Sequence, residues 1–331
     1  MNEAERKRAL ALEAAGGRLV TSRPADVRWL LCGRGRPVET GGADYTVALD
    51  GAAARVLFAD IEEPRVREEE RLEELGYELA PFPWFEGHGL AQTEAVLERL
   101  RLELGAEELD RYRVAGAELG QAMVETVATL TSADTELAAA GRLSANARAR
   151  GFTVPVLLVA GDERQGAHRH PLPTRATLGA HALLAITAER EGLHVSLTRI
   201  VSFGPPPGEL RRLVEAAASV DVAMLTASRP GVTTGEVLEA AAREYEAQGF
   251  PEEWRRHHQG GITGYRGREV FAVPGEATPL PDGCAVAWNP SITGGGKSED
   301  TALVTEARVE VITRTPELGE LQNGRPAIVE L

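Results

Sequence analysis

HALLAITAEREGLHVSLTRIVSF, residues 181–203, consists of two apolar runs separated by the short polar segment REG. In the second run Leu193, Val195 and Leu197 alternate with polar residues, so they share one face of an extended chain. The stretch therefore predicts two long neighbouring strands joined by a short turn.

Helices and further strands are expected on both sides of these two strands. Apolar residues at three-and-four spacing predict helices at 112–131, 134–150, 208–228 and 234–248. Strands are expected in TVPVLLVAG, GCAVAWNPS, DTALVTEARVEVIT and PAIVEL, the last three as an antiparallel run. Two helix pairs flanking one curved antiparallel sheet form an α+β domain, for which we predict the bounds 111–331.

The preceding residues, 1–110, are expected to form a smaller α/β domain with a mixed sheet. Its expected helices are at 3–14, from Pro24 onward, at 64–75 and at 93–103. Its expected strands are RLVTS, the hairpin of YTVALD and ARVLFAD, and YELAPF. A chain of 331 residues is long enough for two such domains.

Composition excludes several classes of partner. A net charge of −14 argues against binding a nucleic-acid backbone through a broad basic surface. No apolar run approaches the roughly 20 residues of a membrane helix, and the charged amphipathic N-terminus lacks the apolar core of a signal peptide. We therefore expect a cytoplasmic protein. Cys32 and Cys284 lie in apolar segments, form no CxxC pair and are expected to be buried, reduced thiols.

HHQGGITGYRGRE, residues 257–269, combines adjacent histidines, glycines and an Arg-Glu pair. It could be a metal site, a substrate clamp or a charged turn. Neighbouring side chains in a strand or a helix point different ways, so at most one of His257 and His258 is expected to face a pocket. We select His258, which is nearer the glycine turn. Arg268 and Glu269 could also simply pair with each other.

The order of these elements, together with several local strings, resembles the pita-bread superfamily of aminopeptidase P, prolidase, methionine aminopeptidase and creatinase. The resemblance covers nearly the whole chain. RLVTSRPADVRWLLCG is similar to the opening of the small N-terminal domain of creatinase and aminopeptidase P. The resemblance implies a pita-bread fold with a smaller N-terminal α/β domain, and a homodimer.

The same resemblance implies a metal pair held by two Asp, one His and two Glu, but most of these positions carry other residues here. The five positions fall at Thr187, Ser196, Gly261, Asn289 and Glu299. Two divalent cations about 3.5 Å apart need several anionic ligands, and only Glu299 supplies one. We therefore predict no metal and no cofactor, with the glycine clearing space at the histidine position.

Creatinase works without metal, and similarity to it suggests which residues take over. His170, in GAHRHPLPT, falls at the position of the catalytic histidine, Glu299 matches one carboxylate, and Arg268 resembles the arginine that grips the substrate carboxylate. The second creatinase carboxylate falls at Thr198, which argues against creatine itself. The predicted catalytic residues are His170 and Glu299. The predicted substrate-binding residues are Arg268, His258, Glu269, Thr187, Ser196 and Asn289.

The chemistry of these residue types supports a hydrolase. Histidine titrates near neutrality, so His170 can take a proton from water and return it to a leaving nitrogen. Glu299 can orient an imidazole or hold a cationic amidine, and Arg268 can bind a carboxylate with two parallel hydrogen bonds. We predict a metal-independent hydrolase that cleaves a C–N bond in a small carboxylated substrate, such as an amidine, a cyclic amide or a guanidino acid. A short peptide is the other substrate class considered.

Two other functions remain open. One is a divergent Xaa-Pro aminopeptidase or prolidase with an altered, mononuclear metal site. His168 and His170 form an H-x-H that would place both rings on one face of a strand, where His257, His258 or Glu299 could complete such a site. The other is a non-catalytic module of the same fold that binds peptides.

Overall fold

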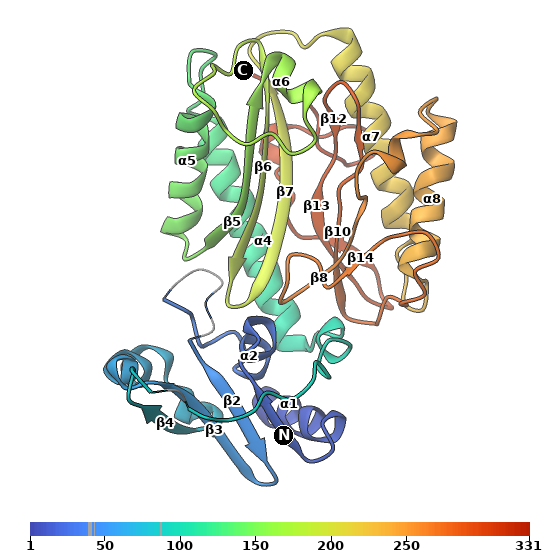
Figure 1. The fold of residues 1–331 in the computed structure, drawn as a ribbon. Helices are drawn as coiled ribbons and strands as arrows, with labels where there is room; N and C mark the ends of the chain where they lie inside the picture. Colours follow the sequence, from blue (N-terminus) through green and yellow to red (C-terminus); the bar gives the residue numbers. More distant parts are fainter. Residues whose placement is uncertain (39–41, 43, 87) are drawn as a thin grey trace.

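The computed structural model describes residues 1–38, 42, 44–86 and 88–331, arranged as a small and a large body (Figure 1). The small body contains a four-stranded sheet in the order β1-β2-β3-β4, in which only β3 and β4 run parallel. Its main elements are α1 (Glu3–Ala14), β1 (Arg18–Thr21), α2 (Pro24–Leu30), β2 (Thr46–Asp50), β3 (Ala53–Ala59) and β4 (Glu78–Phe82). The mixed sheet and the β2–β3 hairpin are as predicted.

The helix predicted at 64–75 is wrong, because this segment consists of short turns. They are η1 (Asp60–Glu62), α3 (Glu63–Arg65), the π-type turn η2 (Val66–Glu70) and η3 (Leu72–Leu75). Arg71 has a φ of 50°, which ends the helical path. The carboxylate of Glu70 accepts hydrogen bonds from the backbone N–H groups of Gly35 and Arg36, at 2.6 and 2.9 Å. This tertiary contact fixes the segment in a shape that its helical pattern does not predict.

The helix predicted at 93–103 is also absent, and only η4 (Leu100–Leu102) forms there. Thr93 is instead bonded to β1: its backbone N–H donates to the carbonyl of Val20, and its hydroxyl accepts from the N–H of Val20 at 2.8 Å. Bonds to a neighbouring strand therefore replace the intrahelical bonds that the periodicity predicts.

The large body begins in α4 (Ala106–Val127), and its central feature is the predicted strand pair. β6 (His181–Arg190) and β7 (Leu193–Ser202) pair over their whole length, from His181 opposite Ser202 to Arg190 opposite Leu193. Glu191 and Gly192 have φ values of 52° and 82° and form the two-residue turn, because a tight hairpin needs positive φ at both central positions. β5 (Thr153–Gly161) lies on the other side of β6.

Two sheets, rather than the single sheet predicted, form the centre of the large body. One has the order β15-β7-β6-β5 and the other β14-β13-β10-β8-β9. The strands of the second sheet are β8 (Gly260–Thr263), β9 (Val270–Phe271), β10 (Cys284–Trp288), β13 (Asp300–Val304) and β14 (Val309–Val311). The sheets meet where the N–H of Thr198 in β7 donates to the carbonyl of Glu299, at 3.0 Å. The last predicted antiparallel strand is a short one, β15 (Val329–Glu330), and it pairs parallel to β7.

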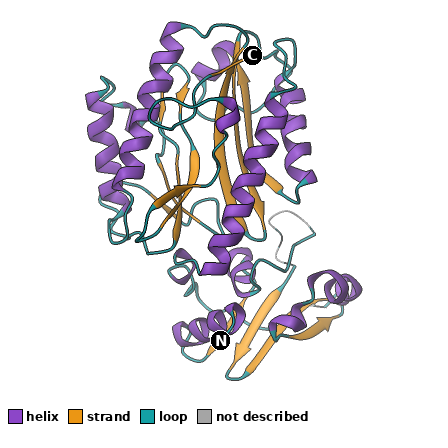
Figure 2. Ribbon diagram, turned by 180° about the vertical axis from the view of Figure 1, so that it is seen from behind, coloured by secondary structure: helices purple, strands orange, loops and turns teal. Residues whose placement is uncertain are grey.

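Two helix pairs cover the outer sides of these sheets, as predicted (Figures 1 and 2). They are α4 (Ala106–Val127) with α5 (Glu136–Ala149), and α7 (Gly208–Ala227) with α8 (Thr234–Ala247). A short helix, α6 (Asp162–Ala167), follows β5, and a small hairpin of β11 (Ser291–Ile292) and β12 (Gly296–Lys297) follows β10. The two sheets thus lie between helix layers, and the loops at their meeting line are free to form a site.

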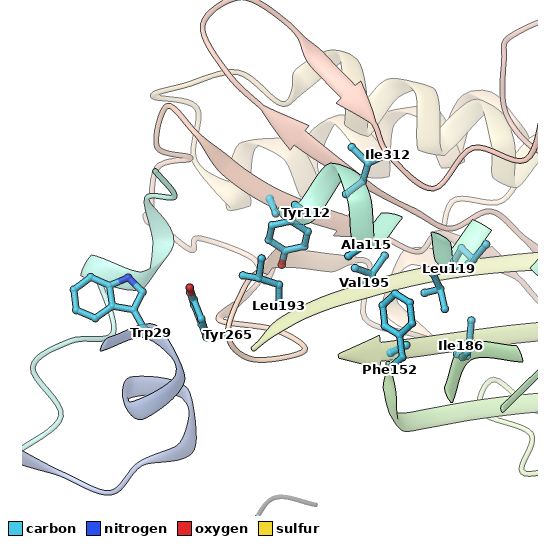
Figure 3. Close-up of a cluster of buried hydrophobic side chains, with 14 of the residues drawn as sticks. Trp29, Tyr112, Ala115, Leu119, Phe152, Ile186, Leu193, Val195, Tyr265 and Ile312 are labelled. Carbon is cyan, nitrogen blue, oxygen red and sulfur yellow. The ribbon is translucent and has the colours of Figure 1, made fainter. Parts of the chain in front are cut away.

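One hydrophobic core runs through both bodies. Figure 3 shows part of it, from Trp29 of α2 and Tyr265 at one end to the residues that α4 packs against β7. The ammonium group of Lys7 lies 5.3 Å from the Trp29 ring centroid and 5.1 Å from that of Tyr265, and it donates to the buried carboxylate of Glu108 at 2.7 Å. These contacts join the small body to the start of α4.

Candidate active site

A cavity of about 410 Å³ lies where the two sheets meet, and it contains most of the predicted site residues. Val156, Leu158 and Ile186 from β5 and β6 provide an apolar wall. The predicted residues that line it are His170, Thr187, His258, Arg268, Asn289 and Glu299. A larger cavity of about 570 Å³ lies between the two bodies and contains none of them. We therefore regard the smaller cavity as the site, because six of the eight predicted site residues line it.

His170 reaches this cavity on a loop that Arg169 holds in place. The guanidinium of Arg169 donates to the hydroxyls of Ser291 and Thr293, at 2.9 and 2.8 Å, and pairs with Glu253. Glu253 belongs to η5 (Glu253–Arg255), which ends one residue before the two adjacent histidines. One arginine therefore brings the His170 loop to the β11–β12 hairpin and to the second histidine segment.

The predicted H-x-H arrangement is not formed, because residues 168–170 follow α6 as a bend rather than a strand. His168 is exposed and lies outside the histidine cluster that contains His170. The alternation argument applies only to extended chain, so it fails here.

Of the two neighbouring histidines, His258 lines the cavity, as selected from the sequence, whereas His257 lies beside His170 without lining it. The rings of His257 and His258 are stacked, with centroids 4.4 Å apart and planes 25° from parallel. The segment bends at His257 instead of continuing as a helix or strand. The buried side chain of Gln259 fixes this bend by donating to the carbonyl of His257 at 2.6 Å, and Tyr245 of α8 donates to Gln259 at 2.8 Å.

The three imidazoles form a compact cluster. The Nε2 atoms of His257 and His170 are 2.9 Å apart, so one donates a hydrogen to the other, and the His170 and His258 ring centroids are 5.7 Å apart. Burial, followed by the charge of Lys297, lowers the pKa of His257 to about 2, and burial together with Arg268 and Lys297 lowers the pKa of His258 to about 4. Burial lowers the pKa of His170 as well. All three rings are therefore neutral at neutral pH.

Glu299 is ionised and is flanked by two cations of the chain. Its carboxylate lies 3.4 Å from the ammonium of Lys297 and 3.5 Å from the guanidinium of Arg268, and it accepts from the Thr198 hydroxyl at 2.6 Å. Burial opposes ionisation, but Lys297, Arg268 and Thr198 outweigh it and lower the pKa of Glu299. Among the described residues, its polar side-chain contacts are to these three groups, and none is to an imidazole.

Lys297 is a site residue that the sequence reasoning missed. It is buried and lines the cavity beside Glu299. A signal was present in GGGKSED, because residues two apart in extended chain share a face, so a lysine two positions before the retained glutamate faces the same cavity.

Arg268 and Glu269 do not pair with each other, and the structure places Glu269 away from the cavity. Glu269 is bound to the buried guanidinium of Arg101, with N–O distances of 3.1 and 2.7 Å, and Arg101 also pairs with Asp26 of α2. Arg268 therefore faces the cavity, while Glu269 fixes the junction between the two bodies.

The prediction of Ser196 as a substrate contact is corrected in a similar way. Its hydroxyl is completely buried and is hydrogen-bonded to that of Thr187 at 2.8 Å. Thr187 lines the cavity, and Ser196 lies behind it.

The prediction that Gly261 clears space for a ligand is also corrected. A Cβ atom at this position would lie 1.9 Å from the carbonyl oxygen of Val270, so the space beside Gly261 is filled by backbone.

These residues do not fit a dinuclear metal centre. Thr187 and Ser196 bond to each other, Gly261 has no donor, and Asn289 is neutral. Glu299 is engaged by two cations that would repel a metal ion. Among the described residues, the one group that could hold an ion is the histidine cluster, whose potential ligand atoms lie within 4.8 Å of one another.

Comparison with known proteins identifies the family. The model of metallopeptidase family M24 matches residues 110–306. The chain belongs to this family. Among curated relatives, a probable dipeptidase PepE of Mycobacterium tuberculosis is 27% identical over 229 residues, which are 67% of this chain and 61% of the relative. An agropine synthesis cyclase of Rhizobium rhizogenes is 34% identical over 116 residues, which are 33% of this chain and 28% of that protein.

The fold agrees with solved structures over the whole chain. The crystal structure of dipeptidase PepE from Mycobacterium ulcerans superposes with a TM-score of 0.77 and 21% identity, covering 99% of this chain and 98% of the other. The predicted pita-bread fold is therefore confirmed. The chain spans about three fifths of the length of the PepE relatives that it matches in sequence, and the names of its relatives include both a dipeptidase and a cyclase. The reaction of this M24 member has to be argued from its own cavity.

Within the described parts of the chain, no helix combines the length and the apolar character needed to cross a membrane.

Proposed function

We propose that this M24 member is a hydrolase that cleaves a C–N bond in a small carboxylated substrate, with His170 carrying the proton and no metal pair taking part. The observation that carries the proposal is that Arg268, Lys297 and Glu299 occupy the cavity as a charged group beside His170. A peptidase with a metal pair needs several anionic side chains to bind the ions. The cavity of this chain instead contains two cationic side chains, Arg268 and Lys297.

The charges of the cavity favour an anionic substrate. Arg268 and Lys297 contribute two positive charges, Glu299 contributes one negative charge, and the histidines are neutral, so the site carries a net positive charge. The Nε of Arg268 is buried without a hydrogen-bond partner among the described residues. A substrate carboxylate would supply this acceptor, because guanidinium and carboxylate form strong charge-assisted hydrogen bonds.

A second unpaired group suggests that the substrate also donates hydrogen bonds. The Oδ1 atom of Asn289 lines the cavity, is buried and has no partner among the described residues. A buried acceptor left unpaired costs roughly 1–3 kcal/mol, so a ligand that donates to it gains that amount. A carboxylate acceptor and an N–H donor together describe a short peptide, an amidino or guanidino acid, or a cyclic amide.

His170 is the proposed acid and base. It takes a proton from water, the resulting hydroxide attacks the carbon of the C–N bond, and the same proton passes to the nitrogen as that bond breaks. His257 acts as a positioning residue, because its Nε2 is hydrogen-bonded to that of His170 and it stays neutral over the physiological range. Lys297 and Arg268 stabilise the negative charge that develops during the attack, and Glu299 holds these cations in position.

The names of the relatives favour peptides within this substrate class. The relatives include proteins named as dipeptidases and as an Xaa-Pro dipeptidase, so a dipeptide with a free carboxylate is the first substrate to test. A metallopeptidase with an altered site and a non-catalytic peptide-binding module are the competing functions.

His170→Asn is the direct test, with His168→Asn as the matched control. His168 is exposed and lies outside the cavity, so the control changes the same residue type two positions away. Turnover of a panel of dipeptides, amidino acids and cyclic amides by chelator-treated protein should fall by at least about 100-fold in His170→Asn and remain unchanged in the control. Equal turnover in His170→Asn and wild type contradicts the role of His170. Substrate binding without turnover in wild type identifies a binding module.

A further inference from the structure

We propose that His170, His257 and His258 form a mononuclear site for a divalent transition-metal ion such as Zn²⁺, and that the ion inhibits the enzyme by taking the lone pair of His170. The inhibitory part rests on the proposed function, whereas the binding site itself does not. The site is separate from the dinuclear position of the family, whose residues do not fit an ion here.

The geometry of the cluster is close to that of a three-histidine site. One nitrogen from each ring lies within 4.8 Å of the other two, and the Nε2 atoms of His170 and His257 are already 2.9 Å apart. Imidazole nitrogens bind zinc at roughly 2.0–2.1 Å, which places two tetrahedral ligands about 3.3 Å apart. His170 is exposed and lies on a loop, so it can make the small movement that closes the site.

Unpaired ring nitrogens provide independent support. The Nδ1 atoms of His257 and His258 are buried and have no hydrogen-bond partner among the described residues, and the His257 side chain belongs to a residue that is only 9% exposed. Within the same described residues, the ring of His258 makes no hydrogen bond at all, and the ring of His257 makes one, to His170. Buried polar atoms in native proteins are normally paired, so the ring of His258, which has no partner beside two other imidazoles, indicates a missing one. An ion bound at Nε2 of His257 leaves the Nδ1 of that ring unpaired, so the support comes from His258.

The surrounding charges decide which ion is suitable. Lys297 and Arg268 are positive and Glu299 is the one carboxylate that lines the cavity, so the field does not attract hard cations that depend on anionic oxygen ligands. Three neutral imidazoles suit zinc, copper and nickel, whose bonds to nitrogen are strong. We therefore expect Zn²⁺, Co²⁺ or Cu²⁺ to bind and Mg²⁺ and Ca²⁺ not to bind.

Co²⁺ is the probe, because its visible absorption reports the coordination of the ion independently of turnover. Chelator-treated full-length protein titrated with Co²⁺ should show one tetrahedral or five-coordinate site per chain. The affinity should fall at least about 10-fold in His257→Ala and in His258→Gln and stay unchanged in His168→Ala. Thermal unfolding of each variant without metal identifies any that fail to fold. Absence of binding by wild-type protein, or equal binding by all variants, overturns the site.

Turnover measured in the same titration distinguishes metal binding from inhibition by the bound metal. A stoichiometric loss of activity as Co²⁺ binds, reversed by chelator, supports inhibition. Unchanged activity with the ion bound overturns the inhibitory role. Activity that appears only with the ion overturns both the inhibitory role and the metal-independent reaction. Binding by a protein that has no turnover with or without metal overturns the proposed function and leaves the metal site supported.

Discussion

At the scale of single residues, the account depends on two cations standing beside one carboxylate. Lys297→Met removes one positive charge and keeps the length of the side chain, so the substrate carboxylate loses a charge-assisted contact worth about 1.5–3 kcal/mol. We expect kcat/KM for a carboxylated substrate to fall about 10- to 100-fold, through KM because the site loses positive charge and through kcat because the same ammonium is proposed to stabilise the charge that develops during the attack. Steady-state kinetics provides the measurement, and Lys297→Arg, which keeps the charge, should recover part of the loss. Equal kinetics for Lys297→Met and wild type would show that this ammonium takes no part.

The resemblance to the pita-bread superfamily implied His170, Arg268, Asn289 and Glu299 as site residues, and all four line this cavity. The sequence did not predict the hydrogen-bond and ion-pair partners of the site residues. Glu269 follows Arg268 directly, yet it binds Arg101, which lies far away in the sequence. His257 contacts His170 because the chain bends at this point, which a regular strand or helix does not predict. Such contacts depend on tertiary structure, which a local pattern does not contain.

At the scale of elements, α1 is held to α4 by ion pairs whose strength depends on pH. Glu3 accepts two hydrogen bonds of 2.8 Å from Arg111 and one of 2.8 Å from Lys7. Burial alone would raise the pKa of Glu3, but Arg111 and Lys7 outweigh burial and lower it from 4.5 to about 2. The contribution of Glu3 to stability is therefore complete above about pH 4.5 and is lost as the pH falls towards 2.

Glu3→Gln should consequently lower the free energy of unfolding at pH 7 by on the order of 2 kcal/mol, and the difference from wild type should shrink as the pH approaches 2. Urea unfolding at several pH values measures both effects. Glu13→Gln in the same helix is the control, because Glu13 is exposed and makes no side-chain ion pair among the described residues. A difference that stays constant with pH would mean that the ion pairs do not account for it.

The elements that were predicted correctly are those that a pattern within their own sequence segment determines. The β6–β7 hairpin follows from alternation and from a two-residue turn containing Gly192, and both helix pairs follow from their periodicity. The segments at 64–75 and 93–103 fail because Glu70 and Thr93 bond to other parts of the small body. Helical propensity is a weak preference that tertiary contacts override.

At the scale of the whole molecule, the predicted homodimer remains to be tested. Trp84 and Phe85 of the small body are 63% and 70% exposed, which is unusual for adjacent large aromatic residues and typical of a covered surface. We expect light scattering to give twice the chain mass of 35.4 kDa. Trp84→Ser combined with Phe85→Ser should shift the protein towards the monomer, whereas Leu137→Ser on α5 should not. A wild-type monomer at micromolar concentration would contradict the prediction.

The fold class and the presence of a small body before a large one were predicted from the order of elements. The division of the large body into two sheets was not, because strand order within a sheet depends on pairings between distant segments. The predicted domain boundary at residue 110 falls within α4. The predictions of a cytoplasmic protein and of no nucleic-acid partner stay predictions.

The most direct test of the central claim is turnover by purified protein before and after exhaustive chelation, with the metal content measured in parallel. The account predicts that no pair of ions is needed, so turnover is retained, or rises as an inhibitory ion leaves the histidine cluster. Loss of turnover on chelation, with recovery after the addition of two equivalents of a divalent metal per chain, would contradict it.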